Sequence, residues 1–304
     1  MSVVSHITVK VPGTTANLGP GFDCIGAALK LYNEFNFTTL DAGELIIQAS
    51  GMEAAKVPTN ETNLLYQAFV KLYQHIQQAP PGIKIEIKLG VPLARGLGSS
   101  ATAIVGGLMG ANYLAGSPLS ELEVIKLAIA MEGHPDNVVP ALLGGCRLAA
   151  TSSTGWEICD LPWHRDIIPV IAIPNFELST AEARQVLPTE YSRADAIFNT
   201  AHLGLLLRGL ATNREEWLKA ALQDKLHQPY RQTLIPGYET VEKAAVATGA
   251  YGMVISGAGP TLLALVDINQ SQSVEIAMRN AWMSTGINSI VRSLSLDTQG
   301  AVIL

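Results

Sequence analysis

The stretch PLARGLGSSAT, residues 92–102, has the composition of an anion-binding turn. It follows an alternating apolar segment and precedes small apolar residues, so we expect a strand, a turn and the beginning of a helix. The first N–H groups of a helix lack partners, and the helix dipole adds about half a positive charge there. Gly96 and Gly98 would let the backbone approach a phosphate closely. Ser99 and Ser100 are able to cap the helix, donate to phosphate oxygens or hold Mg²⁺ through a hydroxyl.

The same stretch also fits a glycine-rich turn that binds nothing, because such turns commonly precede helices. It lacks the GxxxxGK[ST] pattern of a P-loop and the third glycine of the dinucleotide-binding fingerprint. The residue types alone therefore leave a phosphate site and a plain turn open.

Three other stretches gather small and polar residues. Residues 12–26 read PGTTANLGPGFDCIG and carry one charge, Asp23. Residues 132–145 read EGHPDNVVPALLGG, and residues 256–261 read SGAGPT between two apolar segments. Taken singly, they also fit a long turn, a helix end with a polar turn and a hairpin-like turn.

Together the four stretches resemble the GHMP kinase superfamily, in which PLARGLGSSAT is similar to the ATP-phosphate loop and SGAGPTLLAL to the C-terminal glycine motif. Within it, PGTTANLGPGFDCIGAAL and EGHPDNVVPALLGG resemble homoserine kinase signatures, as do LSTAEARQVLP at 178–188 and YRQTLIPGY at 230–238. These motifs extend from residue 11 to about residue 265. The resemblance therefore covers nearly the whole chain.

The resemblance implies an α+β, two-domain GHMP kinase fold. The N-terminal domain would be ribosomal protein S5 domain 2-like and the C-terminal domain ferredoxin-like, with the active site between them. The implied reaction moves the γ-phosphate of ATP to the hydroxyl of L-homoserine, giving O-phospho-L-homoserine for threonine biosynthesis.

ATP and Mg²⁺ are the implied cofactors. Ser99 and Glu132 match the metal ligands of the superfamily, and a carboxylate with a hydroxyl and phosphate oxygens suits magnesium. Asn63 lies where the family approaches adenine, although it also suits a helix N-cap. The residues expected to wrap the nucleotide are Pro92, Leu93, Ala94, Arg95, Gly96, Leu97, Gly98, Ser99, Ser100, Ala101 and Thr102.

Homoserine carries a carboxylate, an ammonium and a hydroxyl, and the matched residue types suit all three. Arg184 and Arg231 match the family's carboxylate-binding guanidinium groups. The remaining implied substrate residues are the acids Asp23 and Asp136, the amides Asn17 and Asn137, and Thr180, whose place at a helix start is equally explained by capping. His134 matches a position in the same turn as Asp136, where we expect it to shape the turn.

Asp23, Asn137 and Glu132 are the expected catalytic residues. Some superfamily members pair an Asp base with a Lys, but Lys10, on the strand before the first loop, is not a convincing partner. We therefore expect direct attack by the substrate hydroxyl, aligned by Asn17, Asp23 and Asn137, with late proton loss to phosphate.

Other kinases of the superfamily remain alternatives, namely those that phosphorylate mevalonate or a sugar. The HPDN sequence and two arginines favour an amino-acid acceptor, but mevalonate also has a carboxylate. A catalytically inactive nucleotide-binding protein is disfavoured by the intact Glu132, Ser99 and glycine motifs.

Composition narrows the class of protein. The 304 residues include 48% hydrophobic and 15% charged residues, enough for a large core. The net charge of −6 argues against a nucleic-acid partner. Every apolar run is interrupted well before the roughly 18 residues that span a membrane, and the first residues do not resemble a signal peptide. Three separated cysteines favour neither disulfides nor zinc, so we expect a cytoplasmic protein; a homodimer is plausible by resemblance.

Periodicity and capping residues predict alternating helices and strands. Expected strands lie at 7–11, 31–40, 83–89, 167–173, 251–255, 262–266 and 290–293, with a loop from 13 to 26. Expected helices lie at 63–78, 101–114, 120–131, from Ser179 to before Pro188, 193–210, 213–226 and 238–248. The Pro/Trp/His segment near 160–168 predicts domains at 1–165 and 166–304.

Overall fold

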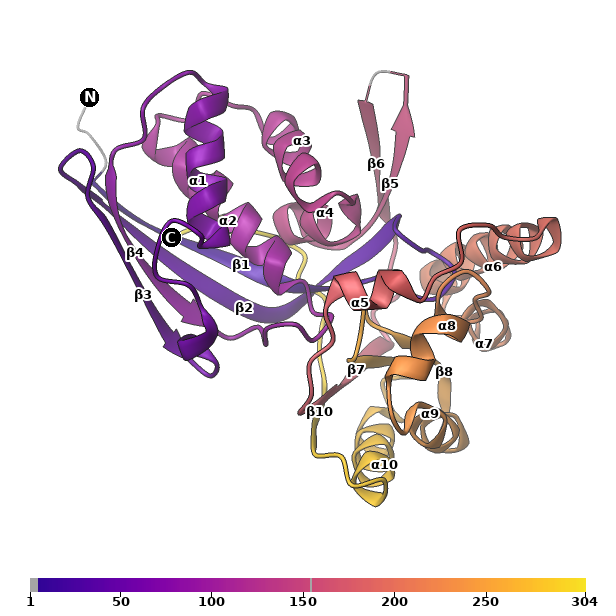
Figure 1. Ribbon diagram of the computed structural model, residues 1–304. Helices are drawn as coiled ribbons and strands as arrows, with labels where there is room; N and C mark the ends of the chain where they lie inside the picture. Colours follow the sequence, from indigo (N-terminus) through magenta and orange to yellow (C-terminus); the bar gives the residue numbers. More distant parts are fainter. Residues whose placement is uncertain (1–4, 154) are drawn as a thin grey trace.

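The computed structural model describes residues 5–153 and 155–304. Two β-sheets, each packed against helices, form two layered units with the loops of the predicted motifs between them (Figure 1). Along its main path the larger sheet has the strand order β11 (Val302–Ile303), β1 (His6–Ala16), β2 (Ile25–Leu40), β4 (Gly82–Leu89) and β3 (Leu45–Gly51). The smaller has the order β10 (Ser289–Ser293), β7 (Ile167–Pro174), β9 (Leu262–Asp267) and β8 (Ala250–Ile255). This mixed arrangement agrees with the predicted α+β class.

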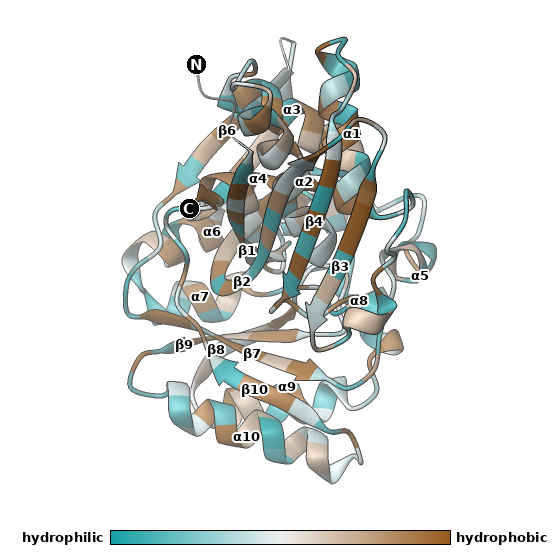
Figure 2. Ribbon diagram, turned by 90° about the vertical axis from the view of Figure 1, so that its left-hand side faces the viewer, coloured by the Kyte–Doolittle hydropathy of each residue, from teal (hydrophilic) through white to brown (hydrophobic). Residues whose placement is uncertain are grey.

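The larger sheet is built on two long antiparallel strands, β1 (His6–Ala16) and β2 (Ile25–Leu40). Along β4 (Gly82–Leu89), buried isoleucines alternate with charged residues, so one face of the sheet is apolar (Figure 2). The edge strand β3 (Leu45–Gly51) pairs with β4 in parallel. A hairpin of β5 (Cys146–Ser152) and β6 (Gly155–Leu161) extends from β2.

Four helices pack on the apolar face of the larger sheet (Figure 1). They are α1 (Leu64–His75), α2 (Ser99–Leu114), α3 (Glu121–Glu132) and α4 (Pro135–Leu143). The amino end of α2, the carboxyl end of α3 and the amino end of α4 all contribute residues to one cavity. This arrangement brings three polar helix ends to one place.

The smaller sheet is antiparallel throughout and has helices on both faces. Its strands are β7 (Ile167–Pro174), β8 (Ala250–Ile255), β9 (Leu262–Asp267) and β10 (Ser289–Ser293). One face packs on α9 (Tyr238–Ala247) and α10 (Ser271–Ser284). The other packs on α6 (Arg193–Thr212) and α7 (Glu215–Ala221) and on the end of the larger sheet.

Short elements connect these layers beside the loops of the first unit. They are α5 (Thr180–Gln185), α8 (Gln228–Arg231) and the 3₁₀ turns η1 (Ala54–Lys56) and η2 (Gln232–Leu234). The chain then returns to the larger sheet through β11 (Val302–Ile303), which pairs with β1. The last strand of the predicted domain 166–304 therefore belongs to the sheet of the first domain. The division between residues 165 and 166 stays a prediction.

Most periodic elements were predicted within a few residues, but one end each of β1 and β2 and several connections were not. The predicted helix over 213–226 is wrong at both ends, since Asn213 terminates α6 with a positive φ and α7 ends at Ala221. The predicted loop over 13–26 is shorter, because β1 continues to Ala16 and β2 begins at Ile25. The sequence reasoning missed β3, α4, the β5–β6 hairpin, α8, α10 and β11.

Among the described residues, no helix combines the length and hydropathy needed to cross a bilayer.

Candidate active site

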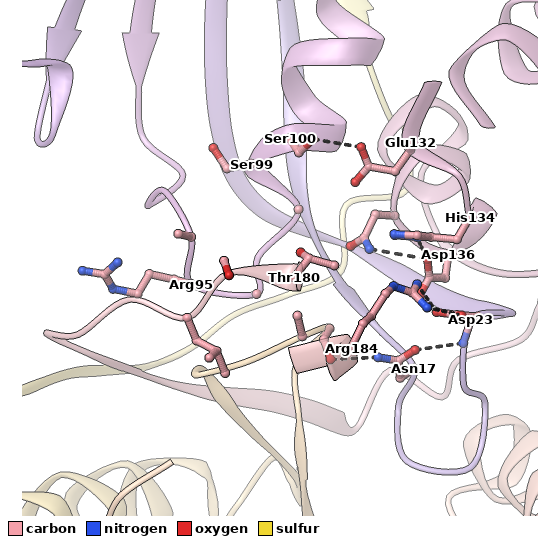
Figure 3. Close-up of a pocket in the computed structure, with 18 of the residues that line it drawn as sticks. Asn17, Asp23, Arg95, Ser99, Ser100, Glu132, His134, Asp136, Thr180 and Arg184 are labelled. Carbon is pink, nitrogen blue, oxygen red and sulfur yellow. Dashed lines mark hydrogen bonds and ion pairs between the residues drawn. The ribbon is translucent and has the colours of Figure 1, made fainter. Parts of the chain in front are cut away.

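A cavity of about 300 Å³ lies between the two units, and all four predicted motifs reach it (Figure 3). Its wall is formed by the phosphate-loop stretch, the loop after β1, the α3–α4 connection and the glycine turn after β8. Helices α5 and α8 contribute Arg184 and Arg231. Residues as far apart in the sequence as Asn17 and Gly257 thus meet in one polar cavity.

The glycine-rich stretch begins α2 as predicted. Gly98 is the N-cap residue with φ +67°, and a Cβ on it would lie 2.0 Å from the Thr14 hydroxyl oxygen. The Thr14 amide donates to the Leu97 carbonyl at 3.0 Å, and its hydroxyl donates to the Asn137 side-chain oxygen at 2.8 Å. The phosphate-loop stretch is therefore fixed against β1 and α4 by contacts that only glycine permits.

The second glycine turn packs directly on this stretch. The Ser256 hydroxyl donates to the Gly96 carbonyl at 2.7 Å, and the Thr261 amide donates to the Arg95 carbonyl at 3.3 Å. The SGAGPT turn therefore supports the phosphate loop, and Gly257 and Ala258 line the same cavity. Sequence reasoning noted the motif but assigned none of its residues to the site.

The two loop serines differ in their contacts. The Ser100 hydroxyl donates a hydrogen bond to Glu132 at 2.8 Å, whereas the Ser99 hydroxyl makes no hydrogen bond within the described residues (Figure 3). Burial raises the pKa of Glu132, while the Ser100 hydrogen bond and the positive charge of His134 oppose that rise. A hydroxyl and a carboxylate at this distance fit the oxygen ligands of magnesium. Ser100, rather than the predicted Ser99, is the serine that meets Glu132.

Asp23 and Arg184 form a two-point ion pair across the cavity, at 2.9 and 3.0 Å (Figure 3). Asp23 has φ +55°, and its amide donates to the Asn17 side-chain oxygen at 2.9 Å. The hydrogen bond from Arg184 to Asp23 raises the pKa of the guanidinium. The predicted carboxylate-binding arginine and ammonium-binding acid are thus held beside each other.

Asp136 and His134 form a second polar pair at the start of α4. The Asp136 carboxylate is buried and lies 2.5 Å from His134 Nδ1. Burial lowers the pKa of His134, but the hydrogen bond and charge of Asp136 outweigh it, so the pKa is raised. The expected turn-shaping contact of His134 is therefore with Asp136.

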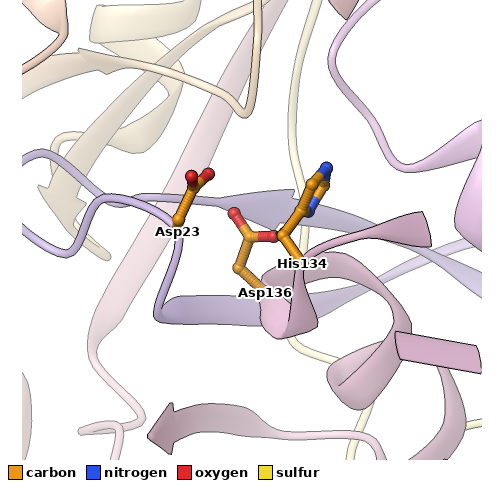
Figure 4. A group of neighbouring side chains, drawn as sticks. All are labelled: Asp23, His134 and Asp136. Carbon is orange, nitrogen blue, oxygen red and sulfur yellow. The ribbon is translucent and has the colours of Figure 1, made fainter. Parts of the chain in front are cut away.

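Asp23, His134 and Asp136 offer ligand atoms within 4.8 Å of one another (Figure 4). Both oxygens of Asp23 are already engaged by Arg184, and Asp136 is engaged by His134. Since the acids have cationic partners, this group resembles a charge-balanced pocket for a zwitterion more than a metal site.

Arg231 is buried, with an exposed fraction of 2%. Its Nε donates to the Ala183 carbonyl at 3.1 Å, and its Nη1 donates to the Gly257 carbonyl at 3.1 Å. The Asn17 amide donates to the same Gly257 carbonyl at 2.8 Å. Within the described residues, Arg231 Nη2 makes no hydrogen bond, so it is left for a group in the cavity that this residue lines.

Thr180 lines the cavity but does not cap its helix. Ser179 is the N-cap of α5 and forms a capping box with Glu182. The capping explanation for Thr180 is therefore wrong, and its hydroxyl is available to the cavity.

A second cavity, of about 270 Å³, adjoins the first and shares Ala94, Ser99 and Ser100 with it. Its wall is mainly apolar, with Leu64 and Leu93 among its residues, which suits a flat aromatic base. Asn63 lies in this wall, but its side chain caps α1 by accepting from the Leu65 and Tyr66 amides at 3.0 and 3.2 Å. It also donates to the Pro58 carbonyl at 2.7 Å, so its polar atoms already have structural partners.

Several predicted nucleotide residues lie beside the cavities rather than facing them. Leu97 and Ala101 are buried in the cores, and Thr102 hydrogen-bonds to Ser99 and Asn33. Pro92 lies near the edge of the smaller sheet. Arg95, by contrast, does line the first cavity, although its guanidinium pairs with Glu53 and Glu177 at 3.5 and 3.3 Å.

Comparisons with known proteins agree with this architecture. Residues 63–145 match the model for the GHMP kinases N terminal domain, and residues 206–285 match that for GHMP kinases C terminal. The chain is 76% identical to a homoserine kinase of Trichormus variabilis, covering 99% of this chain and 100% of the relative. It is likewise 76% identical to a homoserine kinase of Microchaete diplosiphon, covering 99% and 98%.

The crystal structure of a homoserine kinase from Cytophaga hutchinsonii superimposes with a TM-score of 0.90 at 30% identity, covering 100% of this chain and 99% of the other. A mevalonate kinase from Methanococcus jannaschii has a TM-score of 0.70 at 14% identity, covering 96% and 99%, and so shares the fold alone. The chain belongs to the GHMP kinase family, with the predicted two-domain fold. Within that family, the two relatives that are 76% identical to this chain over nearly its full length are both homoserine kinases.

Proposed function

We propose that this protein transfers the γ-phosphate of ATP to the side-chain hydroxyl of L-homoserine, giving O-phospho-L-homoserine. The main observation behind the proposal is that one cavity is lined by the phosphate loop at the start of α2, by two arginines and by two aspartates. Full-length relatives at 76% identity that are homoserine kinases support it.

The charges of the cavity favour an amino acid as the acceptor. A zwitterion brings a carboxylate to Arg231 and Arg184 and an ammonium to Asp23 and Asp136, so each buried or half-buried charge keeps a partner. Mevalonate would compete with Asp23 for Arg184 and bring no ammonium in return, and a sugar would use neither set of charges. The mevalonate kinase structures share only the fold, so that alternative has weaker support.

The nucleotide would lie across both cavities. We infer that its base occupies the apolar cavity beside α1 and that its phosphates lie on the N–H groups at the start of α2. The cavities meet at Ser99 and Ser100. This path directs the terminal phosphate toward the acceptor cavity.

Ser100 and Glu132 fit a magnesium site, as their hydroxyl and carboxylate oxygens lie 2.8 Å apart at the phosphate end of the cavity. When bound there, Mg²⁺ would neutralise phosphate charge. Ser99 remains a candidate through its place in the same turn, but its side chain lacks the contact with Glu132.

Positioning supplies most of the catalysis in this proposal. Asn17 and the backbone of Asp23 are linked by a hydrogen bond, and Asn137 is held by Thr14, so the three predicted aligning residues belong to a fixed network. Because both oxygens of Asp23 are engaged by Arg184, Asp23 is better placed to bind and orient than to remove a proton. We infer that the proton leaves late, to the transferred phosphate.

The proposal extends to a role in threonine biosynthesis, a cytoplasmic location and a homodimer. The family resemblance supports the pathway and the homodimer. The cysteines, free in the described part of the chain, suit a reducing compartment. Sedimentation at several protein concentrations would test the homodimer directly.

A substrate panel tests the central proposal. The protein is incubated with Mg-ATP and homoserine, serine, mevalonate or galactose, and ADP release is followed. ADP release that depends on homoserine is the expected result. Preference for mevalonate or galactose would overturn the substrate, and nucleotide binding without turnover on any acceptor would overturn the activity.

A further inference from the structure

His227 is a buried residue behind the acceptor cavity that the proposed mechanism does not use. It is fully buried and does not line the cavity. It lies at the N-terminal boundary of α8, four residues before Arg231. Its ring contacts both the loop after β1 and α8, which belong to different units of the fold.

The contacts of the ring define its hydrogen-bonding state. Nε2 lies 2.9 Å from the Gly19 carbonyl, and Nδ1 lies 3.4 Å from Arg231 Nη1. A carbonyl only accepts and a guanidinium only donates. The ring therefore satisfies both partners only as the neutral form that carries its proton on Nε2.

Phe22 extends this contact to the predicted substrate residues. Its ring stacks on the His227 ring, with the centroids 5.0 Å apart and the planes 17° apart. The guanidinium carbons of Arg231 and Arg184 lie 5.1 and 5.9 Å from the Phe22 centroid, within cation–π range. Since Phe22 precedes Asp23, the position of the His227 ring bears on both arginines and on the loop carrying Asp23.

Asp224 fixes the backbone at His227, and its Oδ2 lies 3.6 Å from Nε2 of the ring. Its carboxylate accepts the backbone N–H groups of Leu226, His227 and Gln228 at 3.0, 2.8 and 2.7 Å, and an Asn199 side-chain N–H at 2.7 Å. This network makes the turn into α8 and fixes the backbone that carries the His227 ring.

The charged surroundings of the ring are Asp224 and Arg231 from its own segment and Asp23 from the opposite loop. Arg184 of α5 does not contact the ring directly but lies over the Phe22 ring, which stacks on His227. Burial lowers the pKa of His227; the charge of Asp224 opposes this and that of Arg231 adds to it, with a net lowering. The neutral ring required by the geometry is thus also the form favoured near pH 7.

We propose that His227 is a positioning residue for the acceptor: its neutral ring orients the Arg231 guanidinium and holds the Asn17–Asp23 loop against α8. This inference rests on the proposed homoserine kinase activity. It makes homoserine binding, and not ATP binding, dependent on a residue that touches neither substrate.

Two substitutions separate the two contacts of the ring. His227→Gln retains an amide N–H near the Nε2 position for Gly19 but lacks an acceptor at the Nδ1 position. His227→Asn retains an acceptor near Nδ1 for Arg231 and does not titrate. His202→Asn is the control, since the His202 ring stacks on Phe198 within α6 and does not line the cavity.

Steady-state kinetics with each substrate varied are the test. We expect His227→Gln to raise the KM for homoserine about 10- to 100-fold, the cost of a lost hydrogen bond to a charged group. The KM for ATP should change less than about 3-fold, and His227→Asn should recover most of the homoserine affinity. Equal rises in both KM values for both variants, or kinetics like those of His202→Asn, would overturn the inference.

The pH profile adds a readout that a purely structural role would not alter. In the wild type, kcat/KM for homoserine should fall on the acid side, below pH 6.5, as protonated Nδ1 turns an N–H toward the guanidinium. In His227→Asn this component should be absent, while His202→Asn keeps it. An unchanged acid limb in His227→Asn contradicts the inference.

If the variants do not fold, ¹⁵N-histidine spectra of the wild type decide the question. One ring should stay neutral with its proton on Nε2 from pH 8 to below pH 6.5, and its signals should shift when homoserine is added. A spectrum without such a ring refutes the inference. If the wild-type protein does not turn over homoserine, the proposed function fails first, and the two failures are distinct.

Discussion

Asp23 and Arg184 lie 161 positions apart in the sequence and meet in a two-point ion pair, with N–O distances of 2.9 and 3.0 Å. Asp23 belongs to the loop after β1 in the first unit, and Arg184 to α5 beside the second. The pair therefore closes one side of the cavity and links the two units there. It also presets opposite charges next to each other, as a zwitterionic acceptor requires.

Replacing Arg184 by Ala should raise the KM for homoserine by about 10- to 100-fold, because it removes a charge-assisted contact. The KM for ATP should change less than about 3-fold, since Arg184 does not line the apolar cavity proposed for the base. Steady-state kinetics with each substrate varied measure both values. Arg165→Ala, whose side chain is 92% exposed, is the control. Similar rises for both substrates would contradict the assigned role.

The two serines of the phosphate loop should differ in magnesium dependence. Ser100→Ala removes the hydroxyl that contacts Glu132, so the Mg²⁺ concentration for half-maximal activity should rise by about 10-fold or more. Ser99→Ala should change it by less than about 3-fold. Activity titrated with Mg²⁺ at fixed ATP compares them, and the reverse order would restore Ser99 as the predicted ligand.

Sequence patterns predicted the long elements of this fold because burial acts on each of them separately. The isoleucines of β4 alternate with Lys84, Glu86 and Lys88, and Ser120 with Glu123 forms the expected capping box of α3. The family resemblance predicted which motifs meet in the cavity. Local propensity alone could not, since each motif fits an ordinary turn.

Details that depend on contacts between distant segments could not be predicted. Ser99 and Ser100 are equivalent by type, and only the direction of the α2 start relative to α3 brings Ser100 to Glu132. The helix predicted to reach residue 226 stops at Ala221, and the Asp224 carboxylate then accepts three backbone N–H groups and turns the chain into α8. The ion pairs of Arg95 with Glu53 and Glu177, which lie 42 and 82 positions away in the sequence, are another such detail, and its predicted place beside the nucleotide stays a prediction.

Glu53 should make stability depend on pH. Burial would raise its pKa, but hydrogen bonds from the Leu93 amide and Lys56, with the charges of Arg95 and Lys56, lower it below 4.5. A lowered carboxyl pKa stabilises the folded state above the unfolded value of 4.5 and loses that contribution as pH falls through the folded value.

The corresponding variant is Glu53→Gln, which should lower the free energy of unfolding by about 1–2 kcal/mol at pH 7, because Arg95 and Leu93 lose a charged partner. The difference from wild type should shrink as the pH falls below 4.5. Urea denaturation at pH 7, 5 and 4 measures it. A difference that stays constant at all three values would show that ionisation of Glu53 is not responsible.

Gly98→Ala should disrupt the phosphate loop through a steric contact as well as backbone strain. Gly98 and Gly116 both have positive φ, +67° and +86°, but a Cβ would meet the Thr14 hydroxyl at 2.0 Å at Gly98 and nothing within 4 Å at Gly116. Gly116→Ala should therefore cost only the strain of about 1–2 kcal/mol. Gly98→Ala should cost more than about 3 kcal/mol in urea unfolding and raise the KM for ATP, because α2 can no longer begin against β1. If the two variants lose equal stability, the close approach to Thr14 does not determine the loop.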